Sequence, residues 1–285
     1  MENNDLLINK VRRALIKSGF PLELSVTKIL NENDWNCSVS NYYYDFETSI
    51  YREYDIHASK TVNGISVNLF IECKKSEEKQ IILYCPQDRK IPFFMDLYFK
   101  SFPRLPVYTE FITEKIKMKD EFAKLPIFDS NYKLAKGIIF SKGEKIEQDN
   151  SSFFSSFNGL VKQSVMLGYD GFIDTNFRII FLYIVIYEGH LYELTNSRED
   201  DFALNEIDYG QYAFEYHFKV PETSEYSRTQ FLEHLKQYGV QYLIEILKPS
   251  FIKEYLQKIE SIINSINKEN LAQWGRDWPA VPKNN

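Results

Sequence analysis

The chain has 285 residues, with 34 Lys and Arg against 40 Asp and Glu, and therefore a formal net charge of −6. Its composition, 44% hydrophobic and 26% charged with 11 Gly and 10 Pro, is that of an ordinary globular protein and excludes wholesale disorder and collagen-like repeats. The negative charge argues against a histone-like binder of nucleic acid, but an acidic enzyme can still present a basic face to such a substrate.

The start of the chain predicts two helices. Apolar residues recur at helical spacing from Leu7 to Leu15 and predict an amphipathic helix over 5–18. Pro21 suits the first turn of a second helix, and the apolar stripe that follows it predicts this helix over 21–32.

After Trp35 the apolar pattern changes to the period of two that is typical of strands. The dipeptide Asn63-Gly64 is a strong signal for a two-residue hairpin turn. The elements predicted for this region are strands over 37–44, 50–59, 67–75 and 81–85, with a turn over 45–49.

The remainder of the chain mixes strands and helices. A loop-rich stretch over 86–126 carries Lys115, Lys117 and Lys119, which either line a phosphate-binding face or lie in solvent. Further elements are predicted in chain order: a strand over 137–140, a helix over 152–167, a buried strand over 179–187 that turns at Glu188-Gly189 into a strand over 190–194, and helices over 227–247 and 250–267. The pattern predicts an α/β fold with a core over 1–195 and a C-terminal extension over 196–285, packed on the core or part of one domain with it.

The predicted hairpin brings ionisable residues together. With Asn63-Gly64 as its central residues, Asp55 lies directly opposite Glu72, Glu53 lies opposite Lys74, and His57 lies opposite Phe70. Alternate side chains of a strand share a face, so these residues form one face, provided that no bulge shifts the register. The other face is expected to pack on the core and carries Ile50, Tyr54, Ile56, Ala58, Val67, Leu69, Ile71 and Cys73.

Two carboxylates that face each other across a hairpin repel, and a fold tolerates them when a cation lies between them. Carboxylate oxygens and waters form the hard oxygen site that Mg²⁺ prefers. Lys74 points to the same place as Asp55 and Glu72, where it can orient an attacking water and stabilise charge on a phosphate. These residue types predict phosphodiester hydrolysis.

Asp55 followed by Glu72-Cys73-Lys74 resembles the PD-(D/E)xK signature of the restriction-endonuclease-like nuclease superfamily. The order of a helix and then a strand meander is similar, whereas Tyr54 stands where the family usually has a proline. The resemblance covers about residues 5–85 and extends to the predicted helix that contains Gln163. It implies a restriction-endonuclease-like core, with a mixed central β-sheet flanked by helices, plus a C-terminal helical segment.

The resemblance also implies roles for individual residues. Asp55, Glu72 and the Cys73 carbonyl would ligate Mg²⁺, for which Mn²⁺ would substitute, and Lys74 would position the water. Glu23, on the preceding helix, would be catalytic through a second metal or a bound water. The residues expected to contact the substrate are His57, Lys75 and Gln163. The implied activity is that of a Mg²⁺-dependent deoxyribonuclease, of a kind found in bacterial host defence or DNA repair.

Other interpretations of these residues stay open. The acidic and basic residues of the hairpin can form a solvated, salt-bridged strand face, and Glu23 suits the first turn of any helix. Tyr42, Tyr43 and Tyr44 can stack bases or pack against the fold, and His190, His217 and His234 have no metal-ligand spacing. Trp274 and Trp278 either tie down the tail or meet a partner.

Two further functions remain as alternatives. The chain can be a non-catalytic subunit of nuclease fold that binds a protein or nucleic-acid partner, or it can act by the same chemistry on RNA. The expected partner is nucleic acid, DNA rather than RNA, with a protein partner or a second copy of the chain also open.

The cysteines and the start of the chain indicate the compartment. Cys37, Cys73 and Cys85 cannot all pair and show no metal-ligand spacing, which predicts a reducing, cytoplasmic environment. The first residues lack a signal-peptide pattern, and the longest apolar run, 179–187, is about half the ~20 residues that cross a membrane, so no membrane association is expected.

Overall fold

The structure, a computed structural model, describes residues 2–45, 47–62, 65–85, 134–147, 151–171, 178–198, 201–216 and 240–265. Its helices are α1 (Glu2–Lys17), α2 (Phe20–Glu32), α6 (Ser151–Gly171) and α8 (Ile252–Ser265), with the short 3₁₀ helix η4 (Pro249–Phe251). Its strands are β1 (Asn36–Asp45), β2 (Ile50–Val62), β3 (Ile65–Tyr84), β4 (Leu134–Ala135), β5 (Gly137–Lys142), β6 (Lys145–Glu147), β7 (Arg178–Arg198), β8 (Asp201–Glu206), β9 (Tyr209–Tyr216) and β10 (Val240–Leu247).

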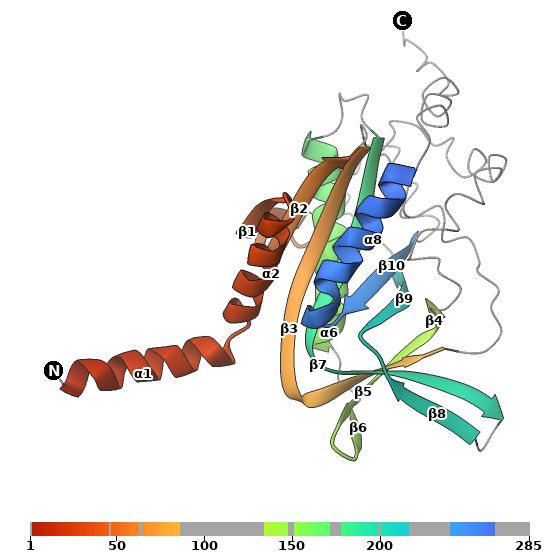
Figure 1. Ribbon diagram of the computed structural model, residues 1–285, viewed down its shortest axis with the longest axis horizontal. Helices are drawn as coiled ribbons and strands as arrows, with labels where there is room; N and C mark the ends of the chain where they lie inside the picture. The colour runs from red at the N-terminus through yellow and green to blue at the C-terminus, as the bar shows by residue number, and fades with distance from the viewer. Residues whose placement is uncertain are drawn as a thin grey trace, which may run out of the picture.

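The strands form one mixed sheet in the order β1-β2-β3-β7-β10-β9-β4, with β5, β6 and β8 paired off this path. β3, β7 and β10 run parallel to one another, whereas β1, β2 and β3 form an antiparallel meander. Helices cover both faces, and α1 projects away from the body of the molecule (Figure 1). The expected α/β fold with a mixed, helix-flanked sheet is thereby confirmed.

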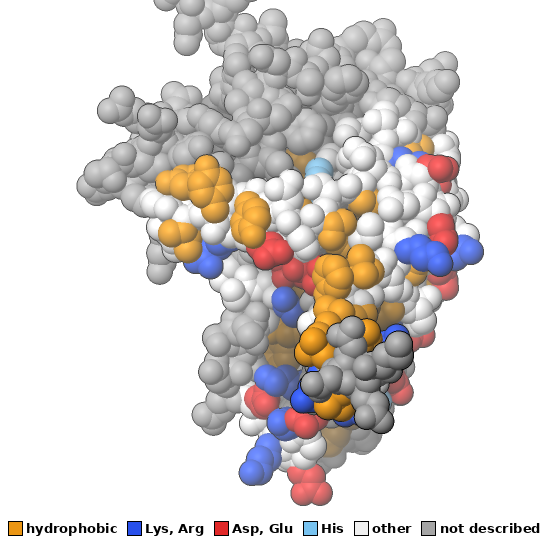
Figure 2. All heavy atoms as spheres, turned by 90° about the vertical axis from the view of Figure 1, so that its left-hand side faces the viewer, with side chains coloured by type: hydrophobic (Ala, Val, Ile, Leu, Met, Phe, Trp, Pro, Cys, Tyr) orange, Lys and Arg blue, Asp and Glu red, His pale blue; other side chains and the backbone are white. Residues whose placement is uncertain are grey.

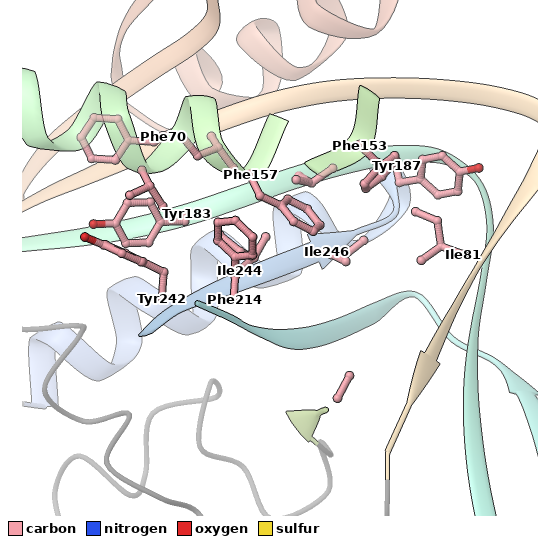
Figure 3. Close-up of a cluster of buried hydrophobic side chains, with 14 of the residues drawn as sticks. Phe70, Ile81, Phe153, Phe157, Tyr183, Tyr187, Phe214, Tyr242, Ile244 and Ile246 are labelled. Atoms are coloured by element: carbon pink, nitrogen blue, oxygen red, sulfur yellow. The ribbon is translucent and has the colours of Figure 1, made fainter. Parts of the chain in front are cut away.

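Each face of the sheet packs its own hydrophobic core. On one face, α2 and α8 lie over residues that include Ile56, Leu69 and Ile184. On the other face, α6 lies over a core rich in aromatic side chains, which Figure 3 shows around Phe157 and Tyr183. Since both faces are covered, the central strands are apolar on both sides.

The register predicted for the β2–β3 hairpin is confirmed. Val62 pairs with Ile65, and the ladder continues in the predicted register to Ile56 and Ile71, where it ends. Asp55 and Glu72 are therefore the first pair beyond the ladder. The turn residues 63 and 64 lie outside the described residues.

Three face assignments in β2 are wrong. Ile50 was expected to pack on the core but is 49% exposed. Glu53 was expected to share a face with Glu72, but it lies next to Tyr54, which faces α6, and therefore points to the opposite side. Tyr54 was expected on the face of Ile56, but it packs with Tyr43 in the core under α6, on the opposite face. In the β1–β2 ladder, Ser40 and Asp55 face each other but do not pair, and Ser40 has a positive φ of 47°. Both strands change face at this point, because Val39 and Ile56 pack in the core under α2 whereas Tyr43 and Tyr54 pack in the core under α6. The face of the hairpin that was expected to be solvated is therefore covered in part by α6.

Two pairs of predicted strands are each one long strand. The segments 67–75 and 81–85 join in β3 through an irregularity between Lys75 and Gln80. The predicted turn at Glu188-Gly189 is absent, because β7 continues through it. A Cβ on Gly189 would lie 2.7 Å from the Ser76 carbonyl oxygen, so this glycine permits close packing between strands rather than a turn.

The helix predicted over 227–247 is wrong for 240–247, which form β10 at the centre of the sheet between β7 and β9. A short apolar run of this kind does not distinguish a buried strand from a buried helix. The predicted helices over 5–18, 21–32, 152–167 and 250–267 are confirmed as α1, α2, α6 and α8. Lys115, Lys117, Lys119, His217, His234, Trp274 and Trp278 lie outside the described residues.

Within these described segments, none of the helices has the length and apolar character needed to cross a membrane.

Candidate active site

The structure brings Asp55, Glu72, Lys74 and Glu23 together at the end of the β2–β3 ladder. Lys74 Nζ lies 3.0 Å from Glu72 Oε2, and the charges of Asp55 and Glu23 both act on the Glu72 carboxyl. Two strands and one helix thus contribute to a single group of three acidic side chains and one lysine.

Asp55 is held by the backbone of the neighbouring strand. Its Oδ2 accepts a hydrogen bond of 2.7 Å from the Cys73 backbone N–H. The ladder between β2 and β3 has ended at Ile56, so this N–H is free to bind a side chain rather than a strand carbonyl. The bond fixes one carboxylate oxygen and joins Asp55 to the residue between Glu72 and Lys74.

Glu72 and Lys74 share the side of β3 that faces α6. A Cβ on Gly159 of α6 would lie 3.7 Å from Glu72 Oε1, so the helix passes close to this carboxyl. The Glu72 side chain is 12% exposed and that of Lys74 is 35% exposed. The Lys74 side chain is therefore more accessible to solvent than the Glu72 side chain.

Glu23 reaches the site from the first turn of α2. A Cβ on Gly19 would lie 3.5 Å from Glu23 Oε1 and 3.9 Å from the Cys73 carbonyl oxygen. These two oxygens therefore lie on the same side of the group, next to the residue where α2 begins. Gly19 leaves the space between them open.

The pKa values of all four side chains are raised, but the causes differ. Burial, and then the charge of Asp55, raise the pKa of Glu72 to about 7, although Lys74 acts against this shift. Burial also raises the pKa of Asp55, although the hydrogen bond from the Cys73 N–H and the charge of Lys74 offset part of this shift. The pKa of Glu23 is raised by burial and by the charges of Asp55 and Glu53. Burial lowers the pKa of Lys74, but Glu72 and Asp55 outweigh it, so the lysine stays protonated.

The donor set fits a hard divalent cation. Asp55, Glu72 and the Cys73 carbonyl supply oxygen atoms, and a cation among them would relieve the repulsion that raises the pKa of Glu72. Among the described residues, no three His, Cys, Asp or Glu side chains form a metal-binding group by themselves. A cation bound here would therefore depend on the carbonyl and on waters, as Mg²⁺ sites commonly do.

The structure gives contacts for two of the three residues expected to contact substrate. His57 Nε2 bonds to Asn68 Oδ1 at 3.1 Å, and its ring stacks on Phe70. Lys75 forms an ion pair of 2.8 Å with Glu188. Gln163 is 1% exposed on α6, and its Nε2 has no hydrogen-bond partner in the described part of the chain.

Sequence reasoning missed a buried ionic cluster beside the site. Lys162 Nζ of α6 lies 2.9 Å from Asp45 Oδ2 and 2.8 Å from Glu47 Oε2, and Arg52 Nε lies 2.7 Å from the same Asp45 oxygen. Tyr216 also donates a bond to Glu47. Lys162 and Tyr216 are far in sequence from the turn that carries Asp45 and Glu47. The sequence of the turn does not indicate which distant residues contact it.

Comparisons with models of protein families, with curated proteins and with solved structures found no match to this chain.

Replacing Glu72 by glutamine is expected to stabilise the metal-free protein at high pH. Because the pKa of Glu72 is raised from 4.5 to about 7, the native carboxyl keeps a proton that the unfolded chain has lost between these values. The wild type therefore loses stability as the pH rises through this window, and an uncharged glutamine does not. In EDTA, we expect Glu72→Gln to raise the free energy of unfolding by about 1–3 kcal/mol at about pH 8 and to have no effect near pH 4.

Urea unfolding at the two pH values measures this difference. Glu78→Gln is the matched control, because Glu78 is an exposed residue of β3 whose pKa is lowered by Lys142 rather than raised. Equal stability of Glu72→Gln and wild type at high pH would contradict the electrostatic repulsion assigned to this site.

Proposed function

We propose that the chain is a metal-dependent nuclease that hydrolyses DNA phosphodiester bonds at the group formed by Asp55, Glu72 and Lys74. The observation that carries the proposal is the convergence of two carboxyl groups and a protonated lysine, with Asp55 bound to the Cys73 N–H at 2.7 Å. The resemblance of these positions to the PD-(D/E)xK signature supports the same activity.

In this proposal Asp55, Glu72 and the Cys73 carbonyl hold Mg²⁺ or Mn²⁺. When bound, the cation supplies Lewis-acid stabilisation of the charge that develops on the phosphate. Glu23 lies next to the Cys73 carbonyl and binds a water or a second cation.

Lys74 acts as a hydrogen-bond donor and not as a base, since its pKa is raised and it stays protonated. Its ammonium group, fixed on Glu72, donates hydrogen bonds to the attacking water and to a phosphate oxygen. The water oxygen bonds to phosphorus, one P–O ester bond breaks, and a phosphate monoester and an alcohol result. The proton released by the water is balanced by the one that the departing oxygen takes up.

The test is cleavage of supercoiled plasmid, linear duplex, single-stranded DNA and RNA with Mg²⁺, Mn²⁺ or EDTA. We expect metal-dependent cleavage of DNA by the wild type and a reduction of at least about a hundredfold in Asp55→Asn. Asparagine still accepts the bond from the Cys73 N–H, so the loss would come from the missing charge and not from misfolding. Calorimetric titration with Mn²⁺ is expected to show weaker binding by this variant.

A folded wild type that cuts no substrate and binds no Mn²⁺ would overturn the proposal. It would favour the non-catalytic role, in which a chain of this fold binds a partner. Cleavage of RNA alone would retain the chemistry and change the substrate.

A further inference from the structure

The β1–β2 ribbon carries exposed tyrosine side chains beside the candidate site. Tyr42 is 60% exposed and Tyr51 is 72% exposed, among the most exposed large hydrophobic residues in the described part of the chain. A large aromatic ring in solvent on a rigid strand is a common feature of surfaces that bind a partner.

These rings share a face of the ribbon with Glu53, whose charge acts on residues of the site. Tyr42 pairs directly with Glu53 in the β1–β2 ladder, and Tyr51 precedes Glu53 by two residues, so all three point to the same side. The charge of Glu53 raises the pKa values of both Asp55 and Glu23. By strand geometry, Tyr51 lies about 13 Å along β2 from Asp55, with Tyr42 between them on the neighbouring strand. The tyrosines therefore form a track on the side of the ribbon that carries Glu53, whose charge acts on Asp55 and Glu23. Tyr43 and Tyr54, like Glu72, face α6 on the opposite side.

The ribbon is held rigidly. The Tyr51 ring packs against that of Tyr44, with centroids 5.4 Å apart in an edge-on arrangement. The turn that joins β1 to β2 is fixed to α6 by the ion pairs of Lys162 with Asp45 and Glu47. This cluster has no place in the proposed chemistry, and its evident effect is to fix the ribbon relative to the site.

Charge complementarity points to a polyanion on this side of the molecule. Helix α1 carries Glu2 and Asp5 in its first turn and Lys10, Arg12 and Arg13 further along, nearer to α2. It projects from the start of α2, the helix that contains Glu23 in its first turn. Figure 2, which faces this side, shows hydrophobic side chains on the surface alongside a group of acidic and basic ones. Phosphates would be drawn to the α1 cations and repelled by Glu53, which leaves bases to lie against the tyrosines.

We propose that Tyr42 and Tyr51 stack unpaired bases of the strand that is cut, so that the substrate has a single-stranded segment beside the scissile phosphate. Bases of a duplex are already stacked on one another and present only their edges in the grooves, whereas an unpaired base offers its face to an aromatic ring. This inference rests on the proposed nuclease function, and it specifies the substrate of the same site.

The test measures binding in EDTA, where no metal-dependent cleavage occurs. A short fluorescein-labelled DNA single strand and the blunt duplex of the same sequence are titrated with wild type, Tyr42→Ala, Tyr51→Ala and the double variant, and anisotropy is recorded. Each alanine is expected to weaken single-strand binding about tenfold and to change duplex binding by less than about twofold. The double variant is expected to weaken single-strand binding about a hundredfold.

Two further variants at each position separate stacking from simple apolar contact. Phenylalanine keeps the ring and is expected to bind as the wild type does, whereas leucine keeps apolar surface without a π-face and is expected to behave as alanine does. Phe202→Ala is the matched control, since Phe202 is a 69% exposed aromatic residue on β8. Both tyrosines are exposed, so circular dichroism is expected to confirm that each variant folds.

The outcomes separate this inference from the proposed function. Equal losses on duplex and single strand, no loss in the alanine variants, or full binding by the leucine variants would each overturn the stacking role, whether or not the protein cleaves DNA. Ring-dependent preference for the single strand would support it. If that preference were found in a protein that cuts nothing with any metal, the tyrosine track would stand as a binding surface and the nuclease proposal would fail.

Discussion

Replacing Lys74 by alanine is expected to lower the rate of metal-dependent DNA cleavage by about a thousandfold, or about 4 kcal/mol of transition-state stabilisation. Lys74 Nζ lies 3.0 Å from Glu72 Oε2, and the charges of Glu72 and Asp55 keep the lysine protonated. The variant loses the group that, in the proposed function, orients the water and stabilises charge on the phosphate. Single-turnover cleavage with saturating Mg²⁺ measures the effect without a contribution from product release.

The matched control is Lys79→Ala. Lys79 lies five residues further along the same strand and forms a 2.7 Å ion pair with Glu147, away from the carboxyl groups of the site. We expect this variant to cleave DNA within about threefold of the wild type, because a partly exposed ion pair away from the site contributes little to stability or positioning. Similar losses in the two variants would mean that lysines of β3 act by general attraction of DNA, and Lys74 would then have no special role.

Lys74→Arg separates charge from geometry. Arginine retains the positive charge but presents a planar, longer group, so it can pair with Glu72 without placing a donor where the ammonium lay. We expect cleavage between that of wild type and that of the alanine variant. The outcome would show how much of the lysine's contribution is positional.

The candidate site could be predicted from sequence because its determinants are local. The Asn63-Gly64 signal and the alternation on both sides of it fix one register, and that register places Asp55 next to Glu72 and Lys74. The helix with Glu23 follows from an equally local apolar pattern. These features need no knowledge of distant residues.

The environment of the site could not be predicted in the same way. The faces of β1 and β2 exchange at Ser40 and Asp55, and a serine in a strand carries no signal for the positive φ that Ser40 adopts there. The helix α6 covers Glu72 at Gly159, where an added Cβ would lie 3.7 Å from Oε1. Both arise from packing between segments that are distant in sequence, so a face predicted as solvated is largely buried.

The central part of the sheet shows a second limit. The strand β10 pairs with β7 on one side and β9 on the other, and both of its faces are buried. Its sequence, Val240–Leu247, is apolar at most positions and lacks the alternation that marks a half-buried strand. Only its position between two other strands distinguishes it from a buried helix.

Replacing Lys162 by methionine is expected to lower the free energy of unfolding by about 3 kcal/mol at neutral pH. Methionine retains the apolar stem and its packing, but it leaves Asp45, which is 0% exposed, and Glu47, which is 10% exposed, without the cation that lies within 3 Å of both. Arg52 still contacts Asp45 in this variant, but Glu47 loses the charge of Lys162, and removing one partner of a buried pair costs more than the pair itself contributes. Chemical unfolding measures the change.

Arg52→Ala is the control that separates a buried partner from an exposed one. Arg52 contacts the same Asp45 oxygen at 2.7 Å, but its side chain is 43% exposed, so we expect a loss of less than about 1 kcal/mol. Equal losses in the two variants would mean that burial does not determine the strength of these ion pairs.

Acid pH supplies the last step of the test. Burial raises the pKa of Asp45, but the bonds from Lys162 and Arg52 outweigh burial and lower it below the ordinary 3.8. The stability that Asp45 gains from its cations is thus complete above pH 3.8 and is lost as the pH falls towards the native pKa. In Lys162→Met the carboxyl takes up its proton at higher pH and acid removes less stability, so the difference between wild type and variant is expected to shrink as the pH falls through 3.8. A difference that stayed constant with pH would assign the loss to packing of the lysine stem and not to its charge.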